Sequence, residues 1–229
     1  MMRIRSVIMV AAGLLGCGAP REPEVQVFAA ASLREVLEEI ASVWTGRAGR
    51  GVRLQFEATS TLARQVEQGA PADVFAVAAP EWLDRRRPLE RYDWLSNRLV
   101  LVVPREAPDP DLGKLRSLAL AGEQVPAGRY ARAAPDRLGV RLPDRVIYGA
   151  HVRDVLSKVA QGGAEAGVVY ATDARMDPRV RVGYVFPAES HPKIVYAVGL
   201  LRPGGKPFFA ALREEWAQEI ARRHGFAAF

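Results

Sequence analysis

Hydroxyl side chains stand at two places in this sequence where a predicted strand gives way to a predicted helix. Ser32 follows a β-forming run that starts at Val25, and the three residues Thr59–Thr61 follow a second such run. A helix N-terminus offers unpaired backbone N–H groups and the positive end of the helix dipole, and a hydroxyl adds another donor. This chemistry suits the binding of an anion. The alternative is that Ser32 only caps its own helix, since Ser32 and Glu35 form the capping-box pattern S-x-x-E.

The sequence carries none of the common catalytic or metal-binding motifs. No two of its three histidines (His151, His191 and His224) stand at metal-ligand spacing. There is no P-loop and no dinucleotide-binding glycine pattern. The nucleophile elbow G-x-S-x-G is also missing, so Ser32 as a hydrolase nucleophile would have only a distant histidine to help it. We therefore expect a binding protein and not an enzyme.

The predicted elements place the hydroxyl residues in an α/β fold. Strand and helix patterns alternate as β-α-β-α-β through the first hundred residues, which is typical of a parallel sheet wrapped by helices. The run Arg98–Pro104 is almost continuously apolar and predicts a strand buried on both faces. A second α/β region follows, with strands predicted at 145–148, 166–170, 184–187 and 194–201 and helices entered at Val125 and Val152. Pro207–His224 is predicted to form one closing amphipathic helix.

Length and composition exclude some classes of partner. The 229 residues suffice for one large domain or two lobes, and 49% are hydrophobic, as in ordinary soluble proteins. The formal net charge is +6, but the arginines are scattered, and the densest run, Arg85–Arg87, is followed at once by Pro88 and acidic residues. No basic stripe alternates with aromatic residues, so we expect no nucleic-acid partner.

The N-terminus is typical of a targeting signal. Arg3 and Arg5 precede an apolar run that is too short to span a membrane as a mature helix. This run ends in Leu14-Leu15-Gly16-Cys17, which resembles a bacterial lipoprotein signal, and Cys17 is the only cysteine. The resemblance implies a signal peptide over residues 1–16, a lipid on Cys17 and a flexible tether over residues 17–24. A plain secretory signal with an incidental cysteine is the alternative.

Five motifs occur in an order that resembles one known family. They are Phe28–Leu33, Ser60–Gln65, Gly69–Phe75, Val125–Gly128 and Gly167–Tyr170. Together they resemble the periplasmic molybdate-binding proteins of ABC importers, the ModA family, over nearly the whole mature chain. The resemblance implies the two-lobed α/β fold of type II periplasmic binding proteins, with each lobe a mostly parallel sheet flanked by helices. Residues 25–97 and 188–229 would form lobe one, and residues 98–187 would form lobe two.

The resemblance also implies an oxyanion held between the lobes by hydrogen-bond donors. Carried over position by position, the donors are the hydroxyls of Ser32 and Tyr170, a hydroxyl of Thr59 or Ser60, and the backbone N–H groups of Ala127 and Val152. The carboxylate of Glu57 stands next to this site and must point away or weaken binding. Molybdate is a dianion without a proton at neutral pH, so it needs donors and no acceptor carboxylate. Molybdenum would be held as molybdate through these residues, and no cofactor is expected.

The sequence therefore predicts an extracytoplasmic solute-binding protein that captures molybdate or tungstate and delivers it to an ABC permease. We expect a monomer in the periplasm or on the outer face of a bacterial membrane, anchored by the lipid on Cys17. Sulfate or another tetrahedral oxyanion is one alternative ligand, because charge and shape are the same and only cavity size would separate them. A lipid-anchored hydrolase that uses Ser32 is the alternative of another class.

Overall fold

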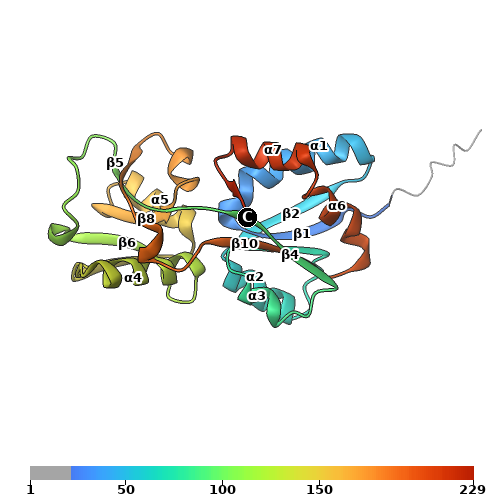
Figure 1. Ribbon diagram of the computed structural model, residues 1–229, viewed down its shortest axis with the longest axis horizontal. Helices are drawn as coiled ribbons and strands as arrows, with labels where there is room; N and C mark the ends of the chain where they lie inside the picture. Colours follow the sequence, from blue (N-terminus) through green and yellow to red (C-terminus); the bar gives the residue numbers. More distant parts are fainter. Residues whose placement is uncertain (1–21) are drawn as a thin grey trace, which may run out of the picture.

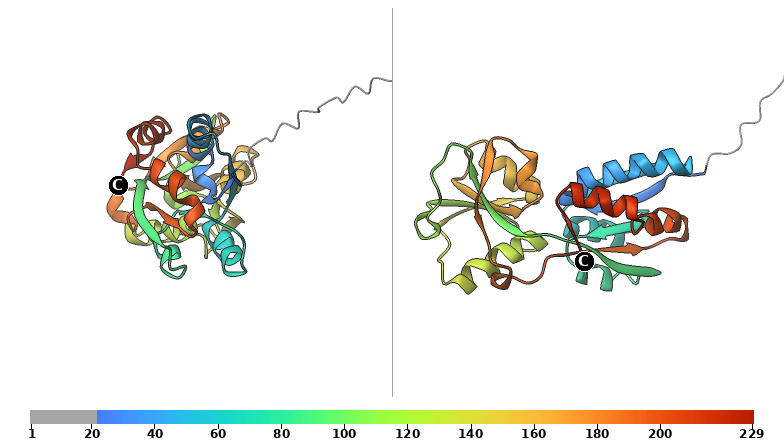
Figure 2. Two further views of the ribbon diagram at one scale, coloured as in Figure 1. Left: turned by 90° about the vertical axis from the view of Figure 1, so that its right-hand side faces the viewer. Right: turned by 45° about the horizontal axis from the view of Figure 1, so that its top comes forward.

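The computed structural model describes residues 22–229, which fold into two α/β lobes that lie side by side (Figure 1). Lobe one is built on a sheet with the strand order β11-β4-β10-β3-β1-β2, and lobe two on a sheet with the order β7-β6-β8-β5-β9. The chain passes between the sheets twice, from β4 into β5 and from β9 into β10. Figure 2 shows that these two segments form a narrow connection between the lobes. The two-lobed α/β fold predicted from the sequence is confirmed.

The sequence elements of each lobe follow one another as alternating strands and helices. Lobe one contains β1 (Val25–Ala30), α1 (Arg34–Ala48), β2 (Val52–Glu57), α2 (Thr59–Glu67), β3 (Val74–Val77), α3 (Glu81–Asp84), β4 (Glu90–Ser96), β10 (Val195–Leu200), α6 (Lys206–Ala211), α7 (Glu215–Arg223) and β11 (Ala227–Ala228). Lobe two contains β5 (Leu99–Pro104), β6 (Ser117–Ala121), α4 (Pro126–Leu138), β7 (Arg145–Gly149), α5 (Val152–Ala160), β8 (Ala166–Tyr170) and β9 (Val180–Val185). Within residues 22–229, no helix is both long and apolar enough to cross a bilayer.

Parallel pairing brings the predicted site segments together at one edge of each sheet. β1 runs parallel to β2, with Ala30 beside Glu57 at the carboxyl ends of the two strands. In lobe two, β6 runs parallel to β7 and to β8, and Ala121 lies beside Gly149. Ligands of open α/β sheets bind outside the carboxyl ends of parallel strands. The topology therefore places the turns after β1, β2, β6, β7 and β8 where they can share one ligand.

Both sheets are mixed, and the expectation of mostly parallel sheets is wrong in this detail. Three neighbouring strands run parallel in each sheet, β3-β1-β2 and β7-β6-β8. The strands that bring the chain into each lobe, β5 and β10, run antiparallel to both of their neighbours. Residues 99–103 of β5 are nearly inaccessible to solvent, which confirms the prediction of a strand buried on both faces.

One strand was not predicted from the sequence, and one predicted helix is wrong. The pattern of charged and aromatic residues in Glu90–Ser96 does not suggest a strand, yet β4 forms because β10 and β11 pair with it on both sides. The single closing helix expected over 207–224 is two helices, α6 and α7. The chain breaks there because the carbonyl of Leu212 accepts hydrogen bonds from the side chains of Trp94, at 3.0 Å, and Gln218, at 2.8 Å.

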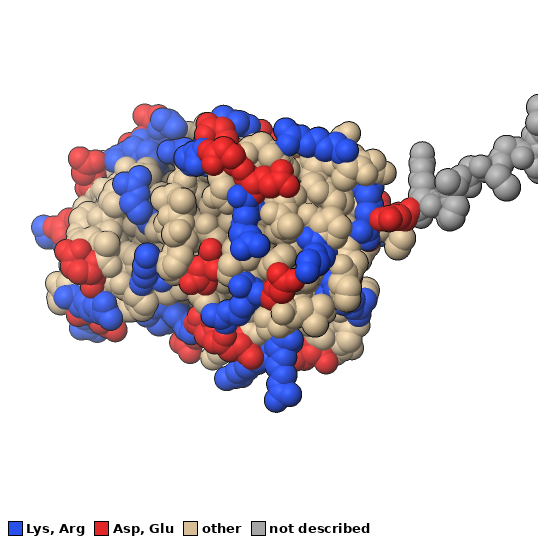
Figure 3. Space-filling model, turned by 45° about the vertical axis from the view of Figure 1, so that its right-hand side comes forward, with Lys and Arg blue, Asp and Glu red and all other residues tan. Residues whose placement is uncertain are grey.

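Charged side chains of both signs are interspersed over the face of the molecule that Figure 3 shows. On that face no continuous basic stripe runs over the surface. Many of these charges form ion pairs, such as Arg222 with Glu215 and Glu219 and Arg34 with Glu38. Exposed pairs of this kind contribute about 0–1 kcal/mol each, so they chiefly keep the surface soluble.

Candidate functional site

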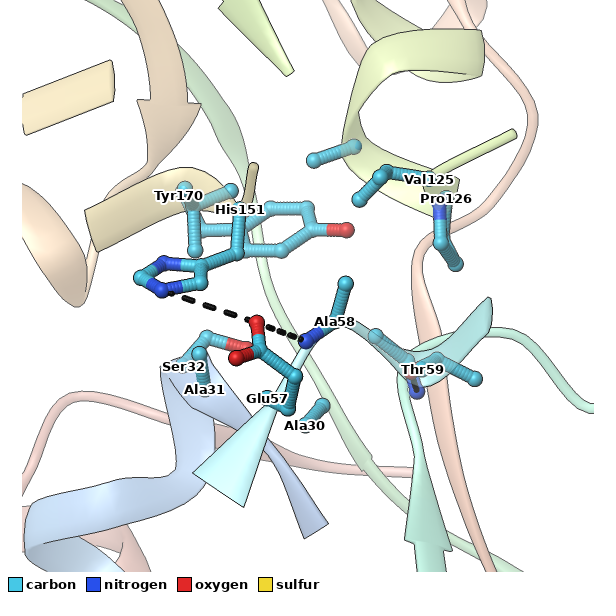
Figure 4. A pocket seen from close by; sticks show the side chains of 13 residues that line it. Ala30, Ala31, Ser32, Glu57, Ala58, Thr59, Val125, Pro126, His151 and Tyr170 are labelled. Carbon is cyan, nitrogen blue, oxygen red and sulfur yellow. Dashed lines mark hydrogen bonds and ion pairs between the residues drawn. The ribbon is translucent and has the colours of Figure 1, made fainter. Parts of the chain in front are cut away.

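A cavity lies between the lobes, at the carboxyl ends of the parallel strands (Figure 4). Lobe one lines it with residues 30–32, 57–59 and 78, and lobe two with residues 125–127, 151–152 and 170. Five of the six residues singled out in the sequence therefore line one cavity: Ser32, Thr59, Ala127, Val152 and Tyr170. Ser60 is buried but does not line the cavity, so the geometry favours Thr59 as the hydroxyl from this turn.

The hydroxyl oxygens of Ser32 and Thr59 already accept hydrogen bonds from other groups of the protein. Tyr196 Oη donates to Ser32 Oγ at 3.0 Å, and the Ala78 N–H donates to Thr59 Oγ1 at 3.2 Å. Tyr196 Oη in turn accepts from the side-chain amide of Asn97 at 3.3 Å, which directs its own proton toward Ser32. Because a hydroxyl has one proton, each of these side chains keeps that proton free to donate into the cavity.

Ser32 does not cap helix α1, so the alternative reading of Ser32 as a capping residue does not hold. It lies in a short 3-10 turn, Ala31–Leu33, and α1 begins at Arg34 with no side-chain hydrogen bond at its N-cap. Glu35 pairs with Arg153 of the other lobe and does not reach back to the turn. The hydroxyl that a capping box would have occupied is therefore available to the cavity.

Tyr170 supplies a third hydroxyl to the cavity. Its side chain is 1% exposed, and its Oη has no hydrogen-bond partner among the described residues. Figure 4 shows the hydroxyl projecting from the ring toward the space beside Ala58 and Val125. Burial raises the pKa of Tyr170 well above its usual value, so the group stays protonated. A buried hydroxyl without a partner is unfavourable, and an acceptor that enters the cavity would satisfy it.

Two helices of lobe two begin at the cavity wall. Ala127 lies in the first turn of α4, directly after Pro126, and Val152 is the first residue of α5. The first backbone N–H groups of a helix have no partner inside it and carry its positive partial charge. The N–H groups of Ala127 and Val152 therefore add backbone donors opposite the hydroxyls of lobe one.

Glu57 lines the same cavity, and one of its two carboxylate oxygens is already engaged. Its Oε1 accepts from the Ala58 N–H at 2.9 Å and lies 3.7 Å from His151 Nε2 of lobe two (Figure 4). His151 Nδ1 accepts from the Asp154 N–H at 3.3 Å, which leaves the ring proton on Nε2, facing the carboxylate. Sequence reasoning missed His151 as a cavity residue. The signal that could have identified it is its position directly before Val152, at the start of a predicted helix.

The remaining chemistry of the cavity fits an anion. Among residues 22–229, no group of three or more His, Cys, Asp and Glu side chains is placed to hold a metal ion. The residues that line the cavity include no Lys or Arg. Its donors are hydroxyls and backbone N–H groups, which bind an anion without the high desolvation cost of a buried ammonium or guanidinium.

The carboxylate of Asp173, which contacts the cavity residue Tyr170, is fully buried. Its Oδ2 accepts from the Tyr170 N–H at 3.3 Å, and its Oδ1 lies 2.6 Å from Arg153 Nε. Burial raises the pKa of Asp173 to about 6, against the opposing effect of the Arg153 guanidinium. Since the pKa in the folded state exceeds the unfolded value of 3.8, the folded protein binds this proton more tightly. Its contribution to stability is fully present below about pH 4 and is lost as the pH rises through about 6.

Asp173→Asn should remove this pH dependence. We expect the free energy of unfolding of the variant, relative to wild type, to increase by about 2 kcal/mol between pH 4 and pH 7. Urea denaturation of both proteins at the two pH values measures this difference. A difference that stays constant across the range would show that Asp173 titrates alike in the folded and unfolded chains.

Comparisons with known proteins show which family and fold this chain shares. Residues 25–227 match the family described as bacterial extracellular solute-binding protein. The chain is 34% identical to the molybdate-binding protein ModA of Escherichia coli, over 90% of this chain and 89% of the relative. It is 31% identical to the putative ABC transporter substrate-binding lipoprotein YvgL of Bacillus subtilis, over 88% of this chain and 85% of the relative. The periplasmic molybdate-binding protein of Azotobacter vinelandii shares the fold, with a TM-score of 0.77 at 22% identity, and the match covers 89% of this chain and 99% of that structure.

Proposed function

This chain belongs to the ModA family of bacterial extracellular solute-binding proteins, and we propose that it captures molybdate between its lobes for an ABC importer. Membership of this family also decides against the serine hydrolase considered for Ser32, since the family binds solutes and does not transform them. The protein works outside the cytoplasm, as extracellular and periplasmic solute-binding proteins do.

The donor set of the cavity is the observation that carries this proposal. Three hydroxyls (Ser32, Thr59 and Tyr170) and backbone N–H groups at two helix starts surround it, and the hydrogen bonds within the protein leave each of them able to donate. Molybdate offers four oxygens that only accept. Hydrogen phosphate would bring a proton that needs an acceptor, and the lining holds a single carboxylate, Glu57, whose Oε1 already accepts from the Ala58 N–H and lies near His151 Nε2, against five donors. The cavity therefore suits an unprotonated dianion.

Because the donors come from both lobes, a bound anion can change how the lobes are arranged. Lobe one contributes Ser32 and Thr59, and lobe two contributes Ala127, Val152 and Tyr170. Charge-assisted hydrogen bonds contribute roughly 1.5–3 kcal/mol each, so an anion that bonds both lobes favours their closed arrangement. We propose that the lobes, residues 25–97 with 188–229 and residues 98–187, move as units about the two connections. Arg137 of α4 donates to the Glu189 carbonyl at 3.0 Å, so residues 188–190 are held by lobe two, and we propose to move the second boundary from residue 187 to Ser190.

Calorimetric titration with molybdate, tungstate, sulfate and phosphate side by side tests the proposed ligand. We expect molybdate and tungstate to bind tightly, sulfate more weakly because it is smaller, and phosphate most weakly because of its proton. Tighter binding of sulfate than of molybdate would replace the proposal by its alternative, a sulfate-binding protein. Absence of binding by all four anions would reject an oxyanion site.

The lipid anchor is a separate part of the proposal. Cys17 and the signal peptide lie outside the described residues, and the support comes from the Leu14–Cys17 pattern and from a relative whose name includes lipoprotein. Cys17→Ser should move the exported protein from the membrane fraction to the soluble fraction, because it removes the sulfur that would carry the lipid. Immunoblots of fractionated cells measure this. Wild-type protein that is wholly soluble after export would contradict the anchor. We further propose that the protein acts as a monomer without a nucleic-acid partner.

A further inference from the structure

Arg153 connects three elements that carry donors of the cavity. It follows Val152 in the first turn of α5, and its guanidinium forms an ion pair with Glu35 in the first turn of α1, three residues after Ser32. On its other side, Arg153 Nε lies 2.6 Å from Asp173 Oδ1, and Asp173 Oδ2 accepts from the Tyr170 N–H at 3.3 Å. One chain of contacts, Glu35–Arg153–Asp173, therefore runs from lobe one to the segments of lobe two that hold Val152 and Tyr170.

None of these three charged residues lines the cavity, so they do not touch an anion bound there. We propose that Arg153 is a positioning residue for the anion site, and that its ion pair with Glu35 fixes the distance between the donors of the two lobes. This inference rests on the proposed oxyanion site, and it adds residues that neither the sequence motifs nor the cavity lining identifies.

Burial makes this contact harder to break than the exposed ion pair Glu81–Arg129, which also joins the lobes. The side chains of Arg153, Glu35 and Asp173 are 17%, 31% and 0% exposed. The Arg153 guanidinium donates a hydrogen bond to Glu35 through Nη2, whereas its Nε pairs with Asp173 by charge and proximity, without hydrogen-bond geometry. A shift between α1 and α5 therefore breaks the directional contact with Glu35. Breaking it leaves a poorly solvated charge without its partner, which is costly.

The pair Glu81–Arg129 also joins the two lobes, but it provides less constraint. Both of its side chains are about half exposed, with 52% for Glu81 and 43% for Arg129. Water solvates these charges when the pair opens, so the pair costs little to break. We therefore assign the spacing of the donors to Arg153 and not to the number of ion pairs across the cleft.

Glu35→Gln tests the ion pair between Glu35 of lobe one and Arg153 of lobe two. Removing a negative charge near an anion site would by itself strengthen anion binding, whereas loss of positioning weakens it. We expect the dissociation constant for molybdate to rise about tenfold or more, through faster dissociation, because a mostly buried pair is broken. Glu38→Gln is the matched control: it makes the same charge change on the same helix, but Glu38 pairs with Arg34 within α1. The control should bind molybdate as wild type does.

Arg153→Lys provides a second, independent variant. An ammonium keeps the positive charge but cannot face Glu35 and Asp173 in the same way as the planar guanidinium. We expect it to bind molybdate more weakly than wild type and to recover part of the affinity that Arg153→Met loses. Calorimetry and stopped-flow dissociation measure binding, and thermal unfolding without ligand reports on the fold.

The possible results separate this inference from the proposed function. The wild-type titration alone decides which anion binds, and the ratio of variant to wild-type affinity can be formed with whichever anion that is. Unchanged affinity in both Glu35→Gln and Arg153→Lys, or an equal change in Glu38→Gln, would overturn the positioning role. Lower melting temperatures with unchanged affinity would reduce Arg153 to a purely structural residue. If wild type binds no oxyanion, the inference falls together with the site.

Discussion

Tyr170→Phe is expected to weaken molybdate binding by about 10- to 150-fold and to leave the ligand-free protein at least as stable as wild type. The Tyr170 hydroxyl is buried and has no partner among the described residues, so its removal breaks no hydrogen bond within them. The ring, which packs edge-on against Tyr196 at 5.9 Å between centroids, is retained. The lost donor should therefore affect only the complex.

Tyr92→Phe is the matched control for this change. Tyr92 Oη donates to the Phe209 carbonyl at 2.9 Å within lobe one, away from the cavity. Its removal should cost about 1 kcal/mol of stability and leave the affinity unchanged. Calorimetry and urea denaturation of both variants give the comparison. If Tyr170→Phe instead lowers stability and binds molybdate as wild type does, the hydroxyl serves the fold and not the ligand.

Tyr170 is also a sharper test than Ser32 or Thr59. Ser32→Ala would take away the acceptor of Tyr196, and Thr59→Val would leave the buried Ala78 N–H without its partner. Each of these substitutions therefore disturbs the protein and the ligand site together. Thr59→Ser keeps the hydroxyl, so it should change the stability and the affinity for molybdate only slightly.

Gly128→Ala is expected to destabilise the protein by about 1–3 kcal/mol or more and to weaken anion binding as well. A Cβ at this position would lie 2.2 Å from the Gly122 carbonyl oxygen and 2.3 Å from that of Ala121. Both obstacles are backbone atoms at the end of β6, so relief requires the first turn of α4 to move. That turn carries Ala127, which lines the cavity, and its backbone N–H would move with it.

Gly46→Ala is the control for a glycine inside a helix. Gly46 lies in α1, and a Cβ added there would meet nothing within 4 Å. Alanine should therefore stabilise the protein by up to about 1 kcal/mol through helix propensity, without any change in affinity. Denaturant unfolding and calorimetry of the two variants test both expectations. If Gly128→Ala keeps wild-type stability and affinity, β6 and α4 can accommodate a Cβ at this position, contrary to the short distances given above.

Much of the site could be predicted because its residues follow the strand ends in the sequence. The alternation of strands and helices implies parallel pairing, and parallel pairing puts the turn after β1, with Ser32, beside the turn after β2, with Thr59. The same logic joins Ala127 and Val152, which follow β6 and β7. The assignment of Ala127, Val152 and Tyr170 as donors came from a family resemblance and not from periodicity.

The contacts that tune the site are not local, and the sequence did not reveal them. Ser32 matches a capping box, but Tyr196, 164 residues further along the chain, donates to its hydroxyl. His151 meets Glu57, and Arg153 meets Glu35, only because the two lobes face each other. Periodicity reports which face of an element is buried, but it does not report which charges meet across a cleft.

A crystal structure of the molybdate complex, with the molybdenum located by its anomalous scattering, tests the central claim most directly. We predict one molybdenum peak in the cavity between the lobes, and a tetrahedral anion whose oxygens accept from Ser32 Oγ, Thr59 Oγ1, Tyr170 Oη and the N–H groups of Ala127 and Val152. Glu57 should remain bonded to Ala58. A peak outside this cavity, or a direct bond from molybdenum to the Glu57 carboxylate, would contradict an oxyanion site built from hydrogen-bond donors alone.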